Sequence, residues 1–376
     1  MKHEIDFPEN LKNLRKKAGL TRKALANKLN YSEKSIEKWE SGDATPPLSV
    51  ICTLSEIFCV SLDTMIYKDK KEIQYFLGVD GGGTKTAFLL EDRDGKKIAF
   101  CELGSSNPND IGMENCLSVL KNGVMQVTED IDRKTVAAYF GIAGGGISGD
   151  NEFIIKKMLS GLGFAVFGNG SDVDNAIELA LGTDDGIVMI AGTGVIGFAQ
   201  IGNKLVRCGG WGYLIDGGGS GYNVGRDALE AALRHIDGRG EYTLITERLE
   251  KHFQKDIRDA IPDIYTGGKR LIASVAPIVF ELAQKGDEVA LSIIDRNCCA
   301  IAQIIRTLQT NFEDMDMPTV ICGGLCSNKE ILKEYVSKHL NTCEHLKLVT
   351  EPMVNGAIKR AQKLAQSLEN EQDKYI

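Results

Sequence analysis

The sequence predicts a multidomain α+β protein, in which an all-helical head precedes a duplicated α/β body of two lobes. Three observations predict this class. Residues 1–66 contain only short helical patterns, whereas β-like runs alternate with helical patterns from residue 75 onward. A glycine-rich corner between two apolar runs occurs twice, at residues 80–86 and 192–197. The chain has 376 residues, which is long for a single hydrophobic core.

The head is predicted to contain three short helices and two further helices that cover them. Thr21 is the expected N-cap of "TRKALANKL", and Ser32 is the expected N-cap of "SEKSIEKWE". In the latter helix Ile36 and Trp39 share one face, which we expect to be buried. The apolar segments "LSVICTLSEIFCV" and "SLDTMI" supply the two covering helices.

Charge is divided unevenly along the chain. The whole chain has a formal net charge of −8, but residues 1–40 carry ten Lys/Arg against six Asp/Glu, so the remainder carries −12. This balance argues against a protein that coats nucleic acid along its whole length, and it leaves a basic head on an acidic body. Between them, the polar stretch "YKDKKEIQ" at residues 67–74 has no apolar period and is the expected linker.

The cellular compartment is predicted from what the sequence lacks. The start "MKHEIDFPENLKNLRKK" has no apolar signal region, and no later stretch approaches the roughly 20 apolar residues of a membrane span. The ten cysteines form no CxxC pairs. We therefore expect a reduced, cytoplasmic protein with no membrane partner and no structural zinc.

The head resembles the phage-repressor (Xre-type) helix-turn-helix family over about 55 residues, through "LTRKALANKL" and "YSEKSIEKWESG". This resemblance implies that the second of these helices enters the major groove of operator DNA. The residues expected at base edges are Ser32, Glu33, Lys34, Glu37 and Lys38, and those expected nearer phosphates are Arg22, Lys23 and Ser35. Because one head offers a small interface, operator binding is expected to need a homodimer. The alternative is a helical docking module without a role in DNA binding.

The first glycine corner, in "FLGVDGGGTKTAFLL", fits neither common phosphate-loop pattern. A Walker A loop needs Lys directly after its last glycine, but Thr84 stands before Lys85, and no helix follows as a Rossmann loop requires. The pattern predicts a hairpin, which nearly repeats in "GIVMIAGTGVIGFAQI". Two such corners with uncovered backbone N–H groups can hold the phosphates of one nucleotide across a cleft. The alternative is a pair of tight hairpins without a ligand.

The body also resembles a known superfamily, that of acetate and sugar kinases, heat-shock chaperones and actin, whose lobes have a ribonuclease H-like fold. Within it the sequence is most similar to the BadF/BadG/BcrA/BcrD ATPase family, which includes N-acetylglucosamine kinase, over about residues 75–365. The matching motifs are "GVDGGGTKTAFLL", "IAGTGVIGFA", "TVICGGL", "CGGWG", "GSGYNVGR" and "NGAIKRA". The resemblance implies a first lobe at residues 75–174 and a second at 175–376, with a C-terminal helix that returns to the first.

Family chemistry implies transfer of the ATP γ-phosphoryl group to a sugar hydroxyl, with Mg²⁺ as cofactor. By this resemblance Asp172 is the general base and also contacts the substrate, and Asp80 holds Mg²⁺ through water. The implied nucleotide-binding residues are Gly82, Gly83, Thr84, Lys85, Gly192, Thr193, Gly194, Gly323 and Gly324. The implied sugar contacts also include Asn107, Thr193 and Gly210. From the residues alone, Asp172 or Asp174 can instead be a simple helix cap.

The sequence departs from the family at one turn. The family reads Gly-Asp-Glu-Gly-Ser there, whereas this chain reads "DGGGS" at residues 216–220, so the acidic pair is replaced by Gly217 and Gly218. Either Asp216 takes the missing position as a substrate contact, or the pocket has lost a carboxylate. One lost charge-assisted hydrogen bond costs about 1.5–3 kcal/mol of binding free energy.

These features predict a transcription regulator whose kinase-like body phosphorylates or senses an amino sugar or related small molecule. One alternative is an active ATP-dependent sugar kinase with an incidental head. A second is an activator ATPase of the dehydratase type, which needs thiolates for an iron–sulfur cluster at a dimer face. Cys298 and Cys299 are adjacent, but they fall in a helix that we expect to be buried.

Overall fold

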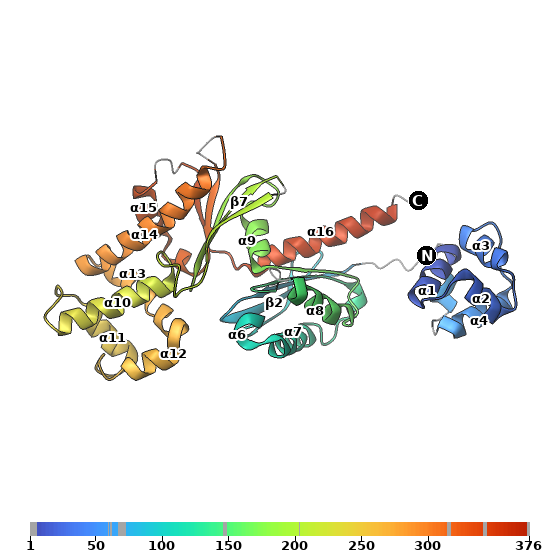
Figure 1. Cartoon of the computed structure of the whole chain (residues 1–376), viewed down its shortest axis with the longest axis horizontal. Helices are drawn as coiled ribbons and strands as arrows, with labels where there is room; N and C mark the ends of the chain where they lie inside the picture. The colour runs from blue at the N-terminus through green and yellow to red at the C-terminus, as the bar shows by residue number, and fades with distance from the viewer. Residues whose placement is uncertain are drawn as a thin grey trace. The chain divides into compact units, whose positions relative to one another are not determined.

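The computed structural model describes residues 6–58, 60, 62–66, 73–145, 149–202, 204–313, 317–340 and 344–373. The chain divides into two compact units, Met1–Glu72 and Ile73–Ile376, which are taken separately below (Figure 1). Most of the predicted linker lies outside the described residues. Its Ile73 is fully buried and packs with the hydrophobic core of the second unit.

The described residues of the first unit, the head, form five helices. They are α1 (Phe7–Lys17), α2 (Arg22–Leu29), α3 (Glu33–Ser41), α4 (Leu48–Phe58) and α5 (Leu62–Ile66). The Thr21 hydroxyl accepts a hydrogen bond from the Ala24 N–H (3.1 Å). The Ser32 hydroxyl accepts one from the Ser35 N–H (3.1 Å). Both predicted N-caps are therefore formed, and Leu25, Ile36 and Trp39 lie in the core between the helices.

The second unit, the body, contains two five-stranded sheets with the same strand order. The first sheet runs β3-β2-β1-β4-β5, and the second runs β8-β7-β6-β9-β10. Their strands are β1 (Tyr75–Gly81), β2 (Lys85–Asp92), β3 (Lys97–Gly104), β4 (Val136–Ile142), β5 (Val166–Gly170), β6 (Gly186–Ala191), β7 (Val195–Ile201), β8 (Lys204–Gly209), β9 (Thr319–Cys322) and β10 (Leu346–Val349). In each sheet two antiparallel hairpins are followed by two parallel strands, which is the duplication that the repeated corner predicts.

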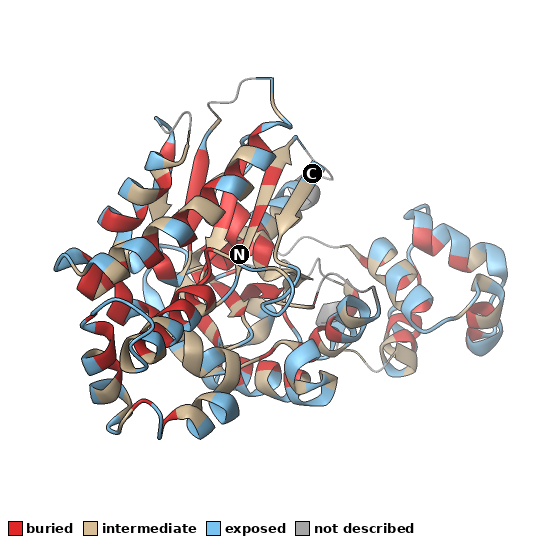
Figure 2. Ribbon diagram, turned by 60° about the vertical axis from the view of Figure 1, so that its left-hand side comes forward, coloured by how far each residue is buried: buried red, intermediate tan, exposed pale blue. Residues whose placement is uncertain are grey.

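Helices flank both sheets, and Figure 2 shows buried residues along the strands and on helix faces. The first lobe has α6 (Pro108–Ile111), α7 (Met113–Val127) and α8 (Gly149–Ser160), and α9 (Asp172–Ala180) leads to the second. The second lobe has α10 (Gly221–Ile236), α11 (Ile245–Phe253), α12 (Ile261–Ala273), α13 (Ala276–Gln284), α14 (Glu288–Gln309) and α15 (Lys329–Lys338). The short 3₁₀ helices are η1 (Arg133–Thr135) and η2 (Gly324–Asn328).

The last helix, α16 (Val354–Asp373), packs back on the first sheet. Gly78 on β1 permits this approach, because a Cβ there would lie 2.7 Å from the Val354 carbonyl oxygen. Gly356 has the same role against α9, where a Cβ would overlap the Asn175 carbonyl oxygen. The helices α9 and α16 therefore cross in close contact beside the strand that carries the first glycine corner.

One helix boundary differs from the prediction. The pattern "FAVFGNGSD" predicts strand over residues 164–172 and "AIELALG" predicts helix over residues 176–182, but β5 ends at Gly170 and α9 begins at Asp172. The reason is a capping box in which the Ser171 N–H donates to Asp174 Oδ2 (2.8 Å), while the Ser171 side chain caps the first turn. No helix among the described residues is long and apolar enough to cross a membrane.

Candidate functional site

The first glycine corner joins β1 to β2. The Gly82 N–H donates to the Lys85 carbonyl oxygen (2.9 Å) and closes the turn. The Gly82 carbonyl oxygen accepts from the Ser105 hydroxyl (3.1 Å). Within the described part of the chain, no group accepts a hydrogen bond from the N–H of Gly83 or Thr84. Two backbone donors are thus free at the tip of this corner, which suits an anionic ligand.

Asp80 lies at the end of β1, next to this corner. Its Oδ1 accepts a hydrogen bond from Asn175 Nδ2 (2.9 Å). Burial raises the pKa of the Asp80 carboxyl to about 6, and the negative charge of Asp172 adds to this increase. The hydrogen bond from Asn175 acts in the opposite direction and lowers the pKa. Two carboxylates therefore lie within electrostatic range of each other at the first corner.

The structure gives the two aspartates in the first turn of α9, Asp172 and Asp174, different partners. Asp174 Oδ2 accepts from the Ser171 N–H and from the Tyr139 hydroxyl (3.2 Å), and its Oδ1 pairs with Arg360 (3.4 Å). Asp172 accepts only local bonds, from the Ser171 hydroxyl (3.0 Å) and the Val173 N–H (3.1 Å). The carboxylate of Asp174 thus makes structural contacts with other elements, whereas the carboxylate of Asp172 contacts only its own turn and can still accept a proton from a ligand. Burial raises the pKa of Asp172.

The second corner joins β6 to β7 and gathers two further segments. The Gly192 N–H donates to the Gly194 carbonyl oxygen (2.9 Å), and the Gly192 carbonyl oxygen accepts from the Gly221 N–H (2.8 Å) at the start of α10. Gly323, with φ 107°, packs its Cα on Ala191. The N–H groups of Thr193 and Gly194 have no acceptor in the described chain. Like the first corner, this corner has two backbone N–H groups without acceptors in the described chain. Unlike β1, however, β6 carries no acidic residue.

Glycine is not required by the fold at the tip of the second corner. Neither Gly192 nor Gly194 has a positive φ, and the atoms nearest to an added Cβ would be 3.9 Å and 4.0 Å away. At Gly197, two residues into β7, an added Cβ would lie only 2.6 Å from Met189 Sδ. The tip therefore has space that the hairpin itself does not use.

Several predicted residues line one cavity of about 690 Å³. Asp80 and Lys85 line it from the first lobe, and Gly323 and Gly324 line it from the second. Asp80 is the predicted Mg²⁺ residue in this lining, and a carboxylate that shares Mg²⁺ with substrate phosphates and water is a normal site for that ion. In the described chain there is no cluster of three or more His, Cys, Asp or Glu residues that would form a metal cage.

Other predicted residues have partners of their own. Lys85 Nζ pairs with Glu102 Oε2 (2.6 Å) at the surface. Asn107 caps α6, where its Oδ1 accepts from the Asn109 N–H (3.0 Å) and its Nδ2 donates to Asp110 (2.9 Å). These contacts place Lys85 and Asn107 beside the first corner with side chains already hydrogen-bonded.

The turn after β8 holds the last two predicted substrate residues. Gly210 has φ 74° and packs on Ile196. Asp216 Oδ2 accepts a hydrogen bond from the Trp211 N–H (2.9 Å), so this carboxylate folds back on its own loop. A Cβ at Gly217 would lie 3.6 Å from Asn223 Nδ2, a buried donor without a hydrogen-bond partner among the described residues.

Sequence reasoning missed Asn175 and Lys269. Asn175 is fully buried and donates to Asp80, while its own Oδ1 has no hydrogen-bond partner in the part of the chain that the structure describes. Lys269 on α12 has its Nζ 4.0 Å from the position of a Cβ on Gly194. The only signal for Asn175 is an amide in the first turn of a helix after the Ser171-Asp172 pair. No local signal marks Lys269, because α12 reaches the corner only through the tertiary fold.

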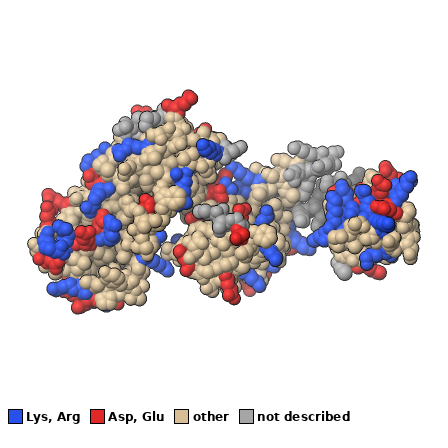
Figure 3. Space-filling view, in the orientation of Figure 1, with Lys and Arg blue, Asp and Glu red and all other residues tan. Residues whose placement is uncertain are grey.

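The head presents α3 to solvent. Ser32, Glu33, Lys34, Glu37 and Lys38 are exposed, and Lys and Arg side chains gather on the face of the head shown in Figure 3. Lys23 is also exposed, and Ser35 is partly buried in a bond with Ser32. Arg22 is held by a buried acid, since its Nε lies 2.8 Å from Glu40 Oε2, which Arg15 also contacts.

Comparison with known proteins agrees with this geometry. A model of the BadF/BadG/BcrA/BcrD ATPase family matches residues 77–358. The chain belongs to this family. A helix-turn-helix model matches residues 11–65, so the BadF/BadG/BcrA/BcrD body carries a helix-turn-helix head.

Individual relatives of this family member are kinases of amino sugars. An N-acetyl-D-glucosamine kinase of Dictyostelium discoideum is 28% identical over 77% of this chain and 97% of its own length. An N-acetylmuramic acid/N-acetylglucosamine kinase of Clostridium acetobutylicum is 31% identical over 72% of this chain and 91% of its own length. A Chromobacterium violaceum structure, solved as a candidate N-acetylglucosamine kinase, shares the fold with a TM-score of 0.62, 24% identity, and coverage of 77% and 100%. The body is thus an N-acetylglucosamine kinase-like, ATP-binding domain.

Proposed function

We propose that this protein is a transcription regulator whose body binds Mg²⁺-ATP and an amino sugar, and transfers the γ-phosphoryl group to that sugar. The observation that carries this proposal is the carboxylate of Asp172, which lies within electrostatic range of Asp80 at the corner whose backbone donors the fold leaves free. The printed activities of the relatives favour an N-acylated amino sugar as the ligand.

In this proposal the two corners hold the triphosphate from opposite sides, through the N–H groups of Gly83, Thr84, Thr193 and Gly194. Asp172 accepts the proton of the attacking sugar hydroxyl, for which its raised pKa is favourable. Asp80 is the residue that holds Mg²⁺, and Asn175 fixes the orientation of its carboxylate. When bound, Mg²⁺ neutralises charge on the phosphate oxygens.

The path of the chain links the proposed site to the head. The chain leaves the head and enters the body at the buried Ile73, directly before β1, which carries Asp80 at its other end. β1 also packs against α16, which crosses α9. Ligand-driven movement of the lobes would therefore reach the first residues of the body through one strand. We propose that two heads of a homodimer bind an operator and that the ligand changes their spacing.

The alternative of a dehydratase-type activator has weaker support. It requires exposed thiolates, but Cys298 is 2% exposed on α14 and burial raises the pKa of its thiol to about 12. A thiol that is buried and protonated is a poor cluster ligand at a dimer face.

The test of the enzymatic proposal is release of ADP with N-acetylglucosamine, measured for the parent and for Asp172→Asn. We expect sugar-stimulated release by the parent and a decrease of about 10²–10⁴-fold in the variant, the range for a lost general base. Asp184→Asn, on an exposed turn after α9, is the matched control and should behave like the parent. Release by Asp172→Asn at the parental rate would refute the base assignment, and no sugar-stimulated release by the parent would refute turnover.

The test of the regulatory proposal is operator affinity of the full chain at moderate salt, with an operator selected by the parent from random DNA. Lys34→Ala and Lys38→Ala should each weaken binding by about 1–3 kcal/mol if they contact bases. Lys251→Ala, exposed on α11 in the body, is the control. Unchanged affinity in both head variants would show that α3 is not the recognition helix.

A further inference from the structure

We propose that Asn223 is a specificity-determining residue, whose side-chain Nδ2 donates a hydrogen bond to the carbonyl oxygen of the ligand's N-acyl group. This inference rests on the proposed function and adds the residue that distinguishes an acylated from a free amino sugar. Asn223 lies in the first turn of α10 and is 1% exposed. Its Nδ2 has no hydrogen-bond partner among the described residues, and a buried donor in this state needs an explanation.

The Ser220 hydroxyl fixes the orientation of this amide. It accepts a hydrogen bond from the backbone N–H of Asn223 (3.2 Å) and donates its own proton to Asn223 Oδ1. The oxygen of the amide therefore faces Ser220, and the Nδ2 donor faces away from it.

The free donor faces a space that Gly217 leaves open. A Cβ at Gly217 would lie 3.6 Å from Asn223 Nδ2, and within 4 Å it would meet no other atom of the described chain beyond the adjoining residues. Gly217 is itself exposed, so a small group of a ligand can enter this space from solvent. The N–H groups of Gly217 and Gly218 also have no acceptor in the described chain.

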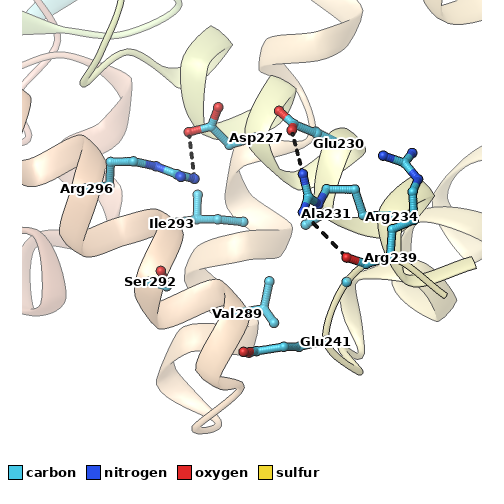
Figure 4. Close-up of a pocket in the computed structure, with 11 residues that line it drawn as sticks. Asp227, Glu230, Ala231, Arg234, Arg239, Glu241, Val289, Ser292, Ile293 and Arg296 are labelled. Carbon is cyan, nitrogen blue, oxygen red and sulfur yellow. Dashed lines mark hydrogen bonds and ion pairs between the residues drawn. The ribbon is translucent and has the colours of Figure 1, made fainter. Parts of the chain in front are cut away.

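Helix α14 holds this glycine turn from the other side. The Gly219 N–H donates to Asn297 Oδ1 (3.0 Å), and Asn297 Nδ2 donates to the Asp227 carboxylate (3.0 Å). Asp227 also pairs with Arg296 (3.3 Å), at one edge of a cavity of about 540 Å³ between α10 and α14 (Figure 4). These bonds hold the turn in place, so the position of the donors is set before a ligand binds.

The acids of the family pattern are absent from this turn. Asp216 Oδ2 accepts from the Trp211 N–H (2.9 Å), and Gly217 and Gly218 follow it. The fold has no room for a side chain at Gly218, because its φ is 116° and a Cβ would lie 2.7 Å from Ala300 Cβ. The turn therefore offers donors where the family pattern has carboxylate acceptors.

A set of donors without an acceptor selects the chemical group that it binds. A carbonyl oxygen only accepts hydrogen bonds, so donors satisfy it completely. A hydroxyl group would leave its own proton unpaired there, and an ammonium group has donors only. Because an unpaired polar group in a buried place is costly, the amide carbonyl of an N-acylated amino sugar is the best match.

Backbone bonds place the first turn of α10 against the second glycine corner. The Gly221 N–H donates to the Gly192 carbonyl oxygen (2.8 Å), and the Tyr222 N–H donates to the Thr193 carbonyl oxygen (3.4 Å). Asn223 is the next residue. The corner proposed to hold phosphate and the donor proposed to select the sugar therefore belong to one site.

The experiment is calorimetric titration of the full chain with N-acetylglucosamine, glucosamine and a non-hydrolysable ATP analogue, alongside ADP release. We expect the parent to bind N-acetylglucosamine at least about tenfold tighter than glucosamine. Asn223→Asp replaces the donor by an acceptor of the same size and should reverse this preference. Asn223→Ala should weaken N-acetylglucosamine about tenfold without strengthening glucosamine. Asn13→Asp, exposed on α1 in the head, is the matched control and should keep the parental preference.

Melting temperatures identify the folded variants, and Asn223→Ala decides alone if Asn223→Asp does not fold. A parent that binds both sugars equally, or neither, would overturn the inference. So would folded Asn223 variants that keep the parental preference, since water would then satisfy Nδ2. Weaker binding of the ATP analogue with unchanged binding of N-acetylglucosamine would assign the donor to the nucleotide and also reject it.

Failure of the proposed function gives a different result. A parent that binds N-acetylglucosamine selectively but releases no ADP in its presence would refute turnover and leave the role of Asn223 standing.

Discussion

The two glycine corners have the same backbone but different neighbours. Each joins the first two strands of a five-stranded sheet, and each leaves two N–H groups at its tip without acceptors in the described chain. The first corner lies beside Asp80, Asn175 and Asp172, whereas the second lies beside Gly323, the start of α10 and Lys269. The duplication thus provides the same backbone corner twice, and the aspartates proposed for the chemistry lie beside only the first of the two corners.

The largest effect is expected from removing the acid of the first corner. Asp80→Asn should decrease sugar-stimulated ADP release by at least about 100-fold, because the neutral amide is a poor ligand for Mg²⁺. In the parent, release should fall as the pH drops below about 6, where Asp80 becomes protonated. Activity that is retained in Asp80→Asn would show that the two corners do not differ in this way.

The same variant should be more stable than the parent at pH 8. The folded protein raises the pKa of Asp80 from 3.8 to about 6, so the protonated form favours folding below pH 4 and that contribution is lost as the pH rises through 6. Asp80→Asn removes the buried charge, and we expect it to gain on the order of 2 kcal/mol in unfolding free energy at pH 8 but little at pH 4. Thermal melts at both pH values measure this, with Asp184→Asn as control. Equal melting shifts at the two pH values would contradict it.

A smaller effect is expected when glycine is replaced at the tip of the second corner or in the strand that follows it, and the two positions should differ in their effect on the unfolding free energy. Gly197→Ala should lower the unfolding free energy by about 1–3 kcal/mol, because its Cβ would collide with Met189 Sδ and with side chains of α14. Gly192→Ala should change it by less than about 0.5 kcal/mol, since the nearest atom is 3.9 Å away. Denaturant unfolding of both variants checks this. A strongly destabilised Gly192→Ala would mean that the hairpin itself needs the glycine.

The smallest effect is expected at the turn beyond the second corner. Gly217→Asp should raise the unfolding free energy by about 1 kcal/mol, because its carboxylate can accept from the buried Asn223 Nδ2, which has no partner among the described residues. Asp184→Asn, at an exposed position, serves again as the control. Loss of stability in Gly217→Asp would show that Asn223 does not face this position.

Local patterns predicted the parts of the site that depend on neighbours in sequence. The two hairpins, the caps at Thr21 and Ser32, and the repeated strand order follow from turn glycines, capping residues and apolar runs. The choice between Asp172 and Asp174 did not follow. It depends on Tyr139 and Arg360, which the fold brings to Asp174 from β4 and α16.

Long-range pairing also explains what sequence reasoning missed. Asn175 reaches Asp80 across 95 residues, because α9 crosses the end of β1. The phosphate contact of Arg22 stays a prediction, and the structure adds that Arg22 is held by the buried Glu40, which Arg15 also contacts. An isolated sequence shows the charge of Arg22 but not the buried carboxylate that faces it.

The most direct test of the central claim is the affinity of a non-hydrolysable ATP analogue with Mg²⁺ for the parent and for Gly194→Ala. The claim is that backbone donors at both corners bind the triphosphate. The added methyl group has free space in the unliganded fold, so the melting temperature should not change, while the analogue should bind roughly tenfold more weakly. An affinity equal to that of the parent, at an equal melting temperature, would contradict the account.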